Sequence, residues 1–150
     1  MNSNAIPSQL PVPGPGPDVV ALPSDPVEWE RLSGAGIRTF FRIAELWGLD
    51  VDQQMALLGL RSRSTYFKWK RERKAKLDRD QLERISHILG IYKALQILLP
   101  DAPSADAWVK RPNKAEPFQG EPALEWMIRG GITGLFTVRR YLDAQRGGWA

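Results

Sequence analysis

The sequence predicts an all-α protein. Three observations support this prediction: apolar residues recur at helical spacing in several segments, helix-capping residues flank these segments, and no useful stretch shows the alternation of a β-strand. The chain has 150 residues, which suits one or two small domains. Because 43% of the residues are hydrophobic, we expect a packed core.

The first predicted helices follow a proline-rich N-terminal segment. Residues 1–26 are rich in Pro, Gly and Ser and carry no charge before Asp18, so we expect a disordered tail and an ordered chain starting between Pro26 and Trp29. A wide apolar stripe predicts a helix over 36–48.

The next two predicted helices are short and close together. The first is predicted over 51–59, with Asp50 or Asp52 as its cap and Gly59 at its end. The second is predicted over about 63–75, and Ser62 and Ser64 are both suitable capping residues for it. Two helices joined by a short turn after a glycine form the helix-turn-helix pattern. Tyr66 and Trp69 share one face of the second helix, and we expect that face to anchor the helix to the core.

The strongest helical pattern covers residues 77–99. Its main apolar stripe is followed by Pro100, which stops the helix. The stripe consists of Leu82, Ile85, Leu89, Tyr92 and Leu95, with Ile88, Ile91 and Leu98 beside it. This sector is too wide for a surface helix with one partner, so the helix is either the centre of the core or part of a dimer interface.

The last third is predicted to be loop-rich and then helical. Residues 101–122 hold four prolines, and Trp108 and Phe118 are expected to fix this loop to the helices, with a turn at Asn113. A helix over 123–129 ends at the Gly130–Gly131 pair, and a last helix then buries three aliphatic residues. These are Leu135, Val138 and Leu142.

The composition excludes several kinds of site. The chain has no cysteine, and its single histidine, His87, cannot form a histidine cluster. No glycine-rich phosphate loop or activated nucleophile is visible. We therefore predict that the protein is not an enzyme and has no catalytic residue, metal or cofactor. No apolar run reaches membrane-spanning length and no signal pattern begins the chain, so we expect a soluble, cytoplasmic protein with no membrane partner.

Positive charge is concentrated in one segment. Residues 61–76 hold eight basic residues and one acid, a net charge of +7, although the whole chain carries only +4. Such a stripe on a near-neutral body indicates a DNA-binding face, whereas the alternative is a solvated basic helix. The expected DNA-contacting residues are Arg61, Arg63, Ser64, Thr65, Lys68, Arg71 and Lys74.

The motif SRSTYFKWK (62–70) resembles the recognition helix of Xre-type regulators. The segments from LDRDQLERISHILG through AWVKRPNKAEPFQG to YLDAQRGG resemble the Xre/MbcA/ParS-like antitoxins, and the match runs from about Arg38 to Gly148. The resemblance implies a bacterial type II antitoxin that neutralises a RES-domain toxin, an NAD-degrading enzyme, and represses its own operon. It also implies a helix-turn-helix domain with its connecting helix over 27–100 and a toxin-binding domain over 101–150.

The expected toxin-binding residues are Arg139, Arg146, Gly147, Gly148 and Trp149. The arginines either lie on a solvated helix face, or they pair with acids or enter a pocket for an anionic dinucleotide. A Trp after two glycines suits insertion into a partner, and local packing is an equal alternative.

The partners expected on this basis are a cognate RES-domain toxin, operator DNA and a second copy of the chain, with hetero-oligomers including the toxin. Two alternatives stay open from the sequence. One is a stand-alone regulator whose C-terminal domain binds an effector or dimerises. The other is a structural dimerisation module with an incidental basic face.

Overall fold

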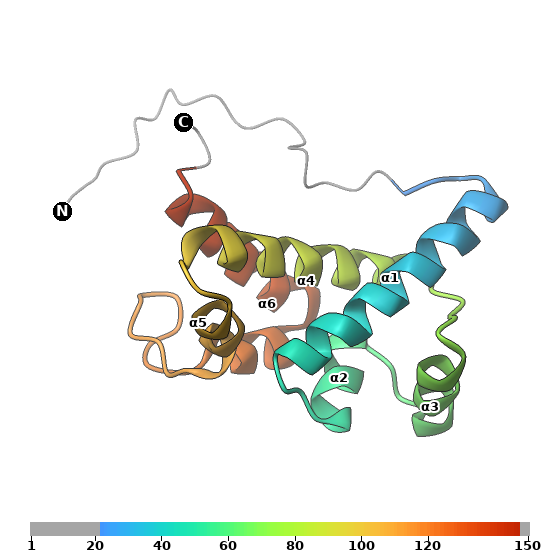
Figure 1. Ribbon diagram of the computed structural model, residues 1–150, viewed down its shortest axis with the longest axis horizontal. Coiled ribbons are helices and arrows are strands. Elements are labelled where there is room, and N and C mark those ends of the chain that lie inside the picture. Colours follow the sequence, from blue (N-terminus) through green and yellow to red (C-terminus); the bar gives the residue numbers. More distant parts are fainter. Residues whose placement is uncertain (1–21, 148–150) are drawn as a thin grey trace.

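The computed structural model describes residues 22–147, and within this range it is helical (Figure 1). The all-α prediction is confirmed, and the only β-type pairing in the described range is an isolated bridge between Pro112 and Pro122. The elements are α1 (Pro26–Leu46), α2 (Val51–Leu58), α3 (Arg63–Glu72), α4 (Arg79–Leu98), α5 (Ala102–Ala107), the 3-10 helix η1 (Trp108–Lys110) and α6 (Ala123–Gln145). The predicted disorder of residues 1–21 lies outside the described residues.

Helix α1 begins ten residues before the predicted start at residue 36. Asp25 caps it by accepting a hydrogen bond from the backbone N–H of Val27, and Pro26 occupies the first helical position. The side chain of Trp29 donates from Nε1 to the carbonyl oxygen of Leu77, 2.7 Å away. This contact ties the early turns of α1 to the segment before α4, and Leu22, in the predicted tail, also packs against the core.

Helices α2 and α3 form the predicted helix-turn-helix. The side chain of Asp50 caps α2, and Gly59 ends it in the left-handed conformation at φ 66°. Ser62 caps α3 by accepting from the N–H of Thr65. Helix α3 stops at Glu72, three residues before the predicted end, because Arg73 adopts a left-handed conformation with φ 58°.

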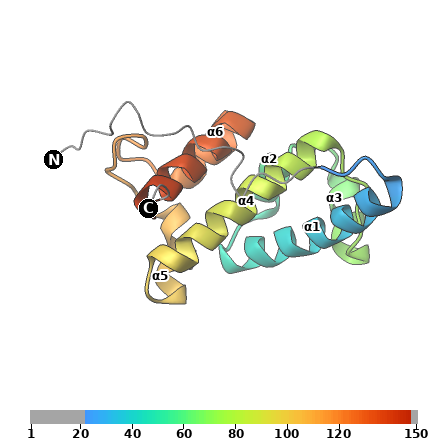
Figure 2. The same cartoon turned by 90° about the horizontal axis from the view of Figure 1, so that it is seen from above.

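Helix α4 is the central helix of the molecule. Seen from above, it lies between α1 and α6 (Figure 2). Packing on both sides explains why its apolar sector is wide: Ile88 and Ile91 are fully buried, whereas Leu89 and Tyr92 of the predicted main stripe are only partly buried. Of the two sequence-based interpretations, the structure shows the central core helix.

Helix α6 bends sharply where the sequence predicts a break. Gly131 has φ 58° and ψ −141°, a conformation that L side chains rarely adopt, and it separates two helical halves. The predicted apolar face of the second half is buried, with Leu135, Val138 and Leu142 at most 2% exposed.

The segment between α4 and α6 is held by aromatic contacts, as predicted. The ring of Trp108 stacks on Tyr141 with a centroid distance of 6.4 Å, and Phe118 is fully buried edge-on to both rings. Asn113 forms the predicted turn by accepting from the N–H of Ala115. Helix α5, a single short helix capped by Asp101, lies within the segment that was predicted to be a loop.

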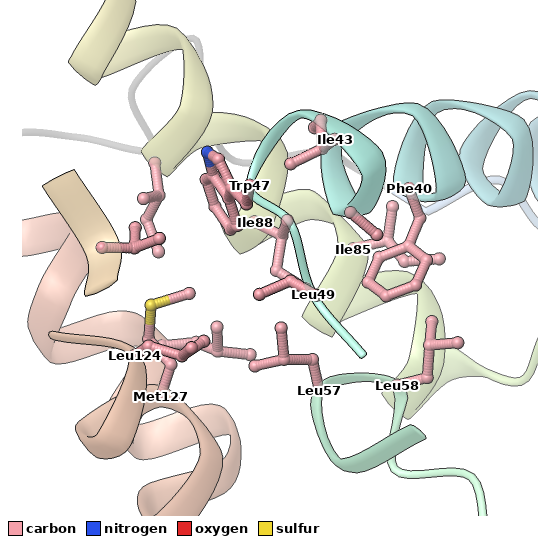
Figure 3. Close-up of a cluster of buried hydrophobic side chains, with 14 of the residues drawn as sticks. Phe40, Ile43, Trp47, Leu49, Leu57, Leu58, Ile85, Ile88, Leu124 and Met127 are labelled. Carbon is pink, nitrogen blue, oxygen red and sulfur yellow. The ribbon is translucent and has the colours of Figure 1, made fainter. Parts of the chain in front are cut away.

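One hydrophobic core joins the two halves of the chain (Figure 3). Trp47, Leu49 and Leu57 from the N-terminal half meet Leu124 and Met127 from α6 (Figure 3). The two domains that were expected to meet at residue 100 therefore share one hydrophobic core. No helix of the described range is both long and apolar enough to cross a membrane.

Candidate functional site

Helix α3 is fixed to the body by its two large buried side chains. Tyr66 is fully buried, and its hydroxyl donates to Oε1 of Gln54 at 2.6 Å, while Nε2 of Gln54 donates to the carbonyl oxygen of Leu49. Trp69 is 9% exposed. These contacts set the angle between α2 and α3, and they leave the opposite face of α3 to solvent.

The exposed face of α3 and its flanking turns collect the predicted DNA-binding residues. Of the seven, only Thr65 is partly buried, and its hydroxyl donates to Oγ of Ser62 at 3.0 Å. The other six are exposed, namely Arg61, Arg63, Ser64, Lys68, Arg71 and Lys74. A rigidly anchored helix with hydroxyl and basic side chains on its free face has the arrangement needed to read a DNA groove.

An ion pair links the first turns of α2 and α3. Nη1 of Arg63 lies 2.8 Å from Oδ1 of Asp52, and both side chains are exposed. Pairs of this kind contribute only about 0.2–1 kcal/mol, so Arg63 stays available to DNA. This pair is not visible in the sequence, because the two residues lie eleven positions apart on different helices.

The basic surface continues beyond α3 into a groove beside α1. Arg38, Lys68, Lys74 and Lys76 line this groove together with Trp29, and two acids, Glu30 and Glu72, also border it. Nη1 of Arg38 donates to the carbonyl oxygen of Arg73 at 3.3 Å. Arg38 was not among the predicted contacts, because only the fold places α1 next to the end of α3.

The solvated helix face that the sequence allowed for Arg139 is wrong. The residue is 7% exposed and lies between α6 and α4, with its Nε 4.0 Å from Oδ2 of Asp143. Its Nη1 lies 3.5 Å from the carbonyl oxygen of Ser86 and 3.3 Å from Nδ1 of His87. The guanidinium occupies space that a side chain at Gly90 would fill. Arg139 therefore holds α6 against α4 and offers little surface to a partner.

The contact with Arg139 also affects the pKa of the His87 imidazole. Burial lowers the pKa of His87 below its ordinary value of 6.5, the positive charge of Arg139 lowers it further, and Glu83 partly opposes the shift. Because arginine only donates, Nδ1 of His87 accepts the hydrogen bond, which favours the neutral ring.

The lowered pKa predicts that acid destabilises the fold through His87. Below pH 6.5 the imidazole of His87 binds a proton in the unfolded chain, whereas in the folded chain it binds this proton only at a lower pH. The free energy of unfolding therefore falls as the pH falls. Urea unfolding at several values between pH 5 and 8 should show a steeper loss for the wild type than for His87→Gln, which cannot titrate. His87 is the only histidine, so equal pH dependence of the two proteins would contradict this assignment.

The remaining predicted toxin-binding residues follow α6 in the sequence. Arg146 is exposed, with Nη1 3.8 Å from Oδ1 of Asp143, and Gly147 follows in a left-handed conformation at φ 67°. Gly148 and Trp149 lie outside the described residues. Within residues 22–147, no three His, Cys, Asp or Glu side chains gather as a metal site would require.

Two protein families match successive parts of this structure. Residues 30–90 match the antitoxin Xre-like helix-turn-helix domain, which covers most of α1, all of α2 and α3, and the first half of α4. Residues 94–148 match the antitoxin Xre/MbcA/ParS C-terminal toxin-binding domain. The chain belongs to the Xre-type antitoxin family.

A curated relative covers most of the same region. The uncharacterized protein y4oB of Sinorhizobium fredii (strain NBRC 101917 / NGR234) is 49% identical over 114 residues, which is 76% of this antitoxin and 86% of y4oB. No solved structure matches the chain. The two family matches meet inside α4, so both domains of this antitoxin contribute to the shared core.

Proposed function

We propose that this antitoxin neutralises a RES-domain toxin that degrades NAD and represses its own operon by binding operator DNA. The match to the toxin-binding domain carries the first half of the proposal, and it favours an antitoxin over a stand-alone regulator. The RES class comes from the resemblance of the C-terminal segments. Both matched domains are binding domains, which suits inhibition by occupation of the toxin rather than by catalysis.

The second half of the proposal is supported by the free face of α3. Four predicted contact residues are exposed on α3 and two more on the segments beside it, and the opposite side of the helix is anchored in the core by Tyr66 and Trp69. The segment 61–76 carries a net charge of +7, which complements the phosphate backbone. A salt-dependent affinity for double-stranded DNA is the expected consequence.

The argument for a homodimer is the symmetry of the DNA site, not the apolar sector of α4. Within one chain, α1 and α6 already bury most of the apolar sector of α4, so the width of this sector no longer argues for a second copy. Helix-turn-helix dimers place two recognition helices on a palindromic site about one helical turn apart. We propose the same arrangement for this antitoxin, with the toxin joining the assembly as a hetero-oligomer.

For the toxin contact, we propose that Trp149 enters a pocket of the toxin, with Gly147 and Gly148 as a hinge and Arg146 contacting acidic or anionic groups beside it. Buried tryptophans dominate many interfaces, and truncating such an anchor costs about 2–4 kcal/mol. Arg139 contributes indirectly, because its buried contacts position the second half of α6.

Removing this anchor tests the toxin contact. Trp149→Ala, or deletion of residues 147–150, is expected to raise the antitoxin concentration needed for half-inhibition of the toxin at least about thirtyfold. NAD consumption by purified toxin is the measurement, and DNA affinity of the same variants should stay at the wild-type value. Inhibition by the truncated protein equal to that of the full chain would rule out this contact.

A further inference from the structure

Phe67 is an apolar side chain on the otherwise polar exposed face of α3. It is 46% exposed, and it lies in the middle of α3 among exposed basic and hydroxyl residues. In the described range only four large hydrophobic residues are this exposed, and Phe67 is the one within the basic segment 61–76. The four are Val27, Phe67, Ile97 and Phe136.

The core does not require this ring. Tyr66 and Trp69 are buried and anchor α3, whereas Phe67 is half-exposed and packs edge-on against Tyr66, its neighbour in the same helix, with centroids 5.1 Å apart and an interplanar angle of 83°. On the other side, the guanidinium carbon of Arg63 lies 5.8 Å from the Phe67 ring centroid. The ring is thus held in a defined orientation beside Arg63, with part of its surface open to solvent.

We propose that Phe67 determines sequence specificity by contacting the C5-methyl group of a thymine in the major groove. This inference rests on the proposed DNA binding. In the major groove, the thymine methyl is the apolar feature of the base edges, and phenylalanine is one of the side chains that contact it. The positive charge around Phe67 brings α3 to DNA, so the exposed ring then meets base edges rather than bulk water.

The position of Phe67 relative to Arg63 predicts where the thymine lies. The two residues are four positions apart on one helix, a rise of about 6 Å. Base pairs are stacked about 3.4 Å apart. If Arg63 reads a guanine, the thymine read by Phe67 therefore lies about two base pairs away.

Methyl deletion in the DNA provides the test. The full chain is first used to select its preferred site from random double-stranded DNA. Each thymine of that site is then replaced by deoxyuridine, which lacks only the methyl group. Wild-type affinity should fall about fourfold at one position, the value of one buried methyl group, and stay unchanged at the others.

Variants at position 67 identify the side chain responsible. Phe67→Ala should bind the thymine and deoxyuridine sites equally, whereas Phe67→Leu, which keeps an apolar contact, should retain part of the difference. Unfolding midpoints of both variants should stay near the wild-type value, because the ring is half-exposed. Arg71→Ala, on the same free face of α3, is the matched control: it should weaken all sites alike and preserve the thymine preference.

Several outcomes would overturn the inference. The inference fails if the wild-type protein shows no preference for thymine over deoxyuridine at any position. It also fails if Phe67→Ala keeps the wild-type preference for thymine. A Phe67→Ala variant that loses toxin binding but keeps its DNA affinity would place the ring in a protein interface. If the wild type selects no DNA at all, the proposed operator binding itself fails, which is a distinct result.

Discussion

Gly134→Ala is expected to destabilise the protein by at least about 3 kcal/mol, the upper part of the range for overpacked sites. A Cβ atom at this position would overlap the carbonyl oxygen of Trp126 and lie 3.1 Å from its carbonyl carbon and 3.5 Å from Cα of Met127. All three are backbone atoms, so no side-chain rotation relieves the overlap. The two halves of α6 would have to separate where Met127 enters the shared core.

Gly130→Ala is the matched control for this prediction. Gly130 lies four residues earlier in α6, and a Cβ added there meets nothing within 4 Å. Alanine should therefore be neutral or stabilise by up to about 1 kcal/mol through its helix propensity. Urea unfolding of both variants is the measurement. A Gly134→Ala protein as stable as Gly130→Ala would show that the halves of α6 do not pack as described.

Arg63→Ala combined with Lys68→Ala is expected to weaken operator binding on the order of a hundredfold, because it removes two of the proposed DNA contacts and two positive charges. Both side chains are exposed, so stability should hardly change. Fluorescence anisotropy with labelled operator DNA at several salt concentrations is the measurement, and the salt dependence should become less steep.

A charge-matched control separates this effect from a loss of net charge. Lys93→Ala with Lys114→Ala removes two exposed positive charges outside α3, and it should change operator affinity only slightly. Equal losses for the two double variants would mean that general electrostatics, not the free face of α3, dominates binding. Unchanged affinity of the Arg63/Lys68 variant would move the DNA contact elsewhere, for example to the groove lined by Arg38 and Lys76.

Local signals in the sequence were sufficient to predict helix starts and the break in α6. Capping residues such as Asp50 and Ser62 start helices by hydrogen bonds within three residues, and Gly131 breaks α6 by its own backbone freedom. The helix-turn-helix was therefore predictable, and so was the anchoring role of Tyr66 and Trp69. The predicted and observed helix ends differ mainly where a distant contact decides them.

Long-range packing explains what the sequence did not reveal. Helix α1 contains Gly34 and Gly36, which weaken helix propensity. The fold nevertheless extends the helix, because Gly36 lies against Ile85 of α4 and the Trp29 side chain donates to the Leu77 carbonyl oxygen. Arg139 looked like a surface residue, but Gly90, forty-nine positions earlier, leaves the space in which its guanidinium is buried. Such pairs produce no signal at helical spacing.

The shared core has a consequence for how the two functions are connected. Side chains of α2 and α6 meet in one cluster, and Nη1 of Arg84 in α4 also approaches the carbonyl oxygen of Ala56 in α2 at 3.4 Å. Damage to the core from either half should therefore affect both proposed functions, whereas substitutions at Arg63 and Trp149 should affect one each. Gly134→Ala is expected to lose both activities together.

The most direct test of the account is co-expression of the antitoxin with the product of its neighbouring gene, which we propose to be the RES-domain toxin, followed by purification and measurement of NAD consumption. The account predicts that the two proteins purify as one complex and that NAD consumption by the toxin is suppressed. Separate elution of the two proteins with toxin activity intact would contradict the proposed neutralisation.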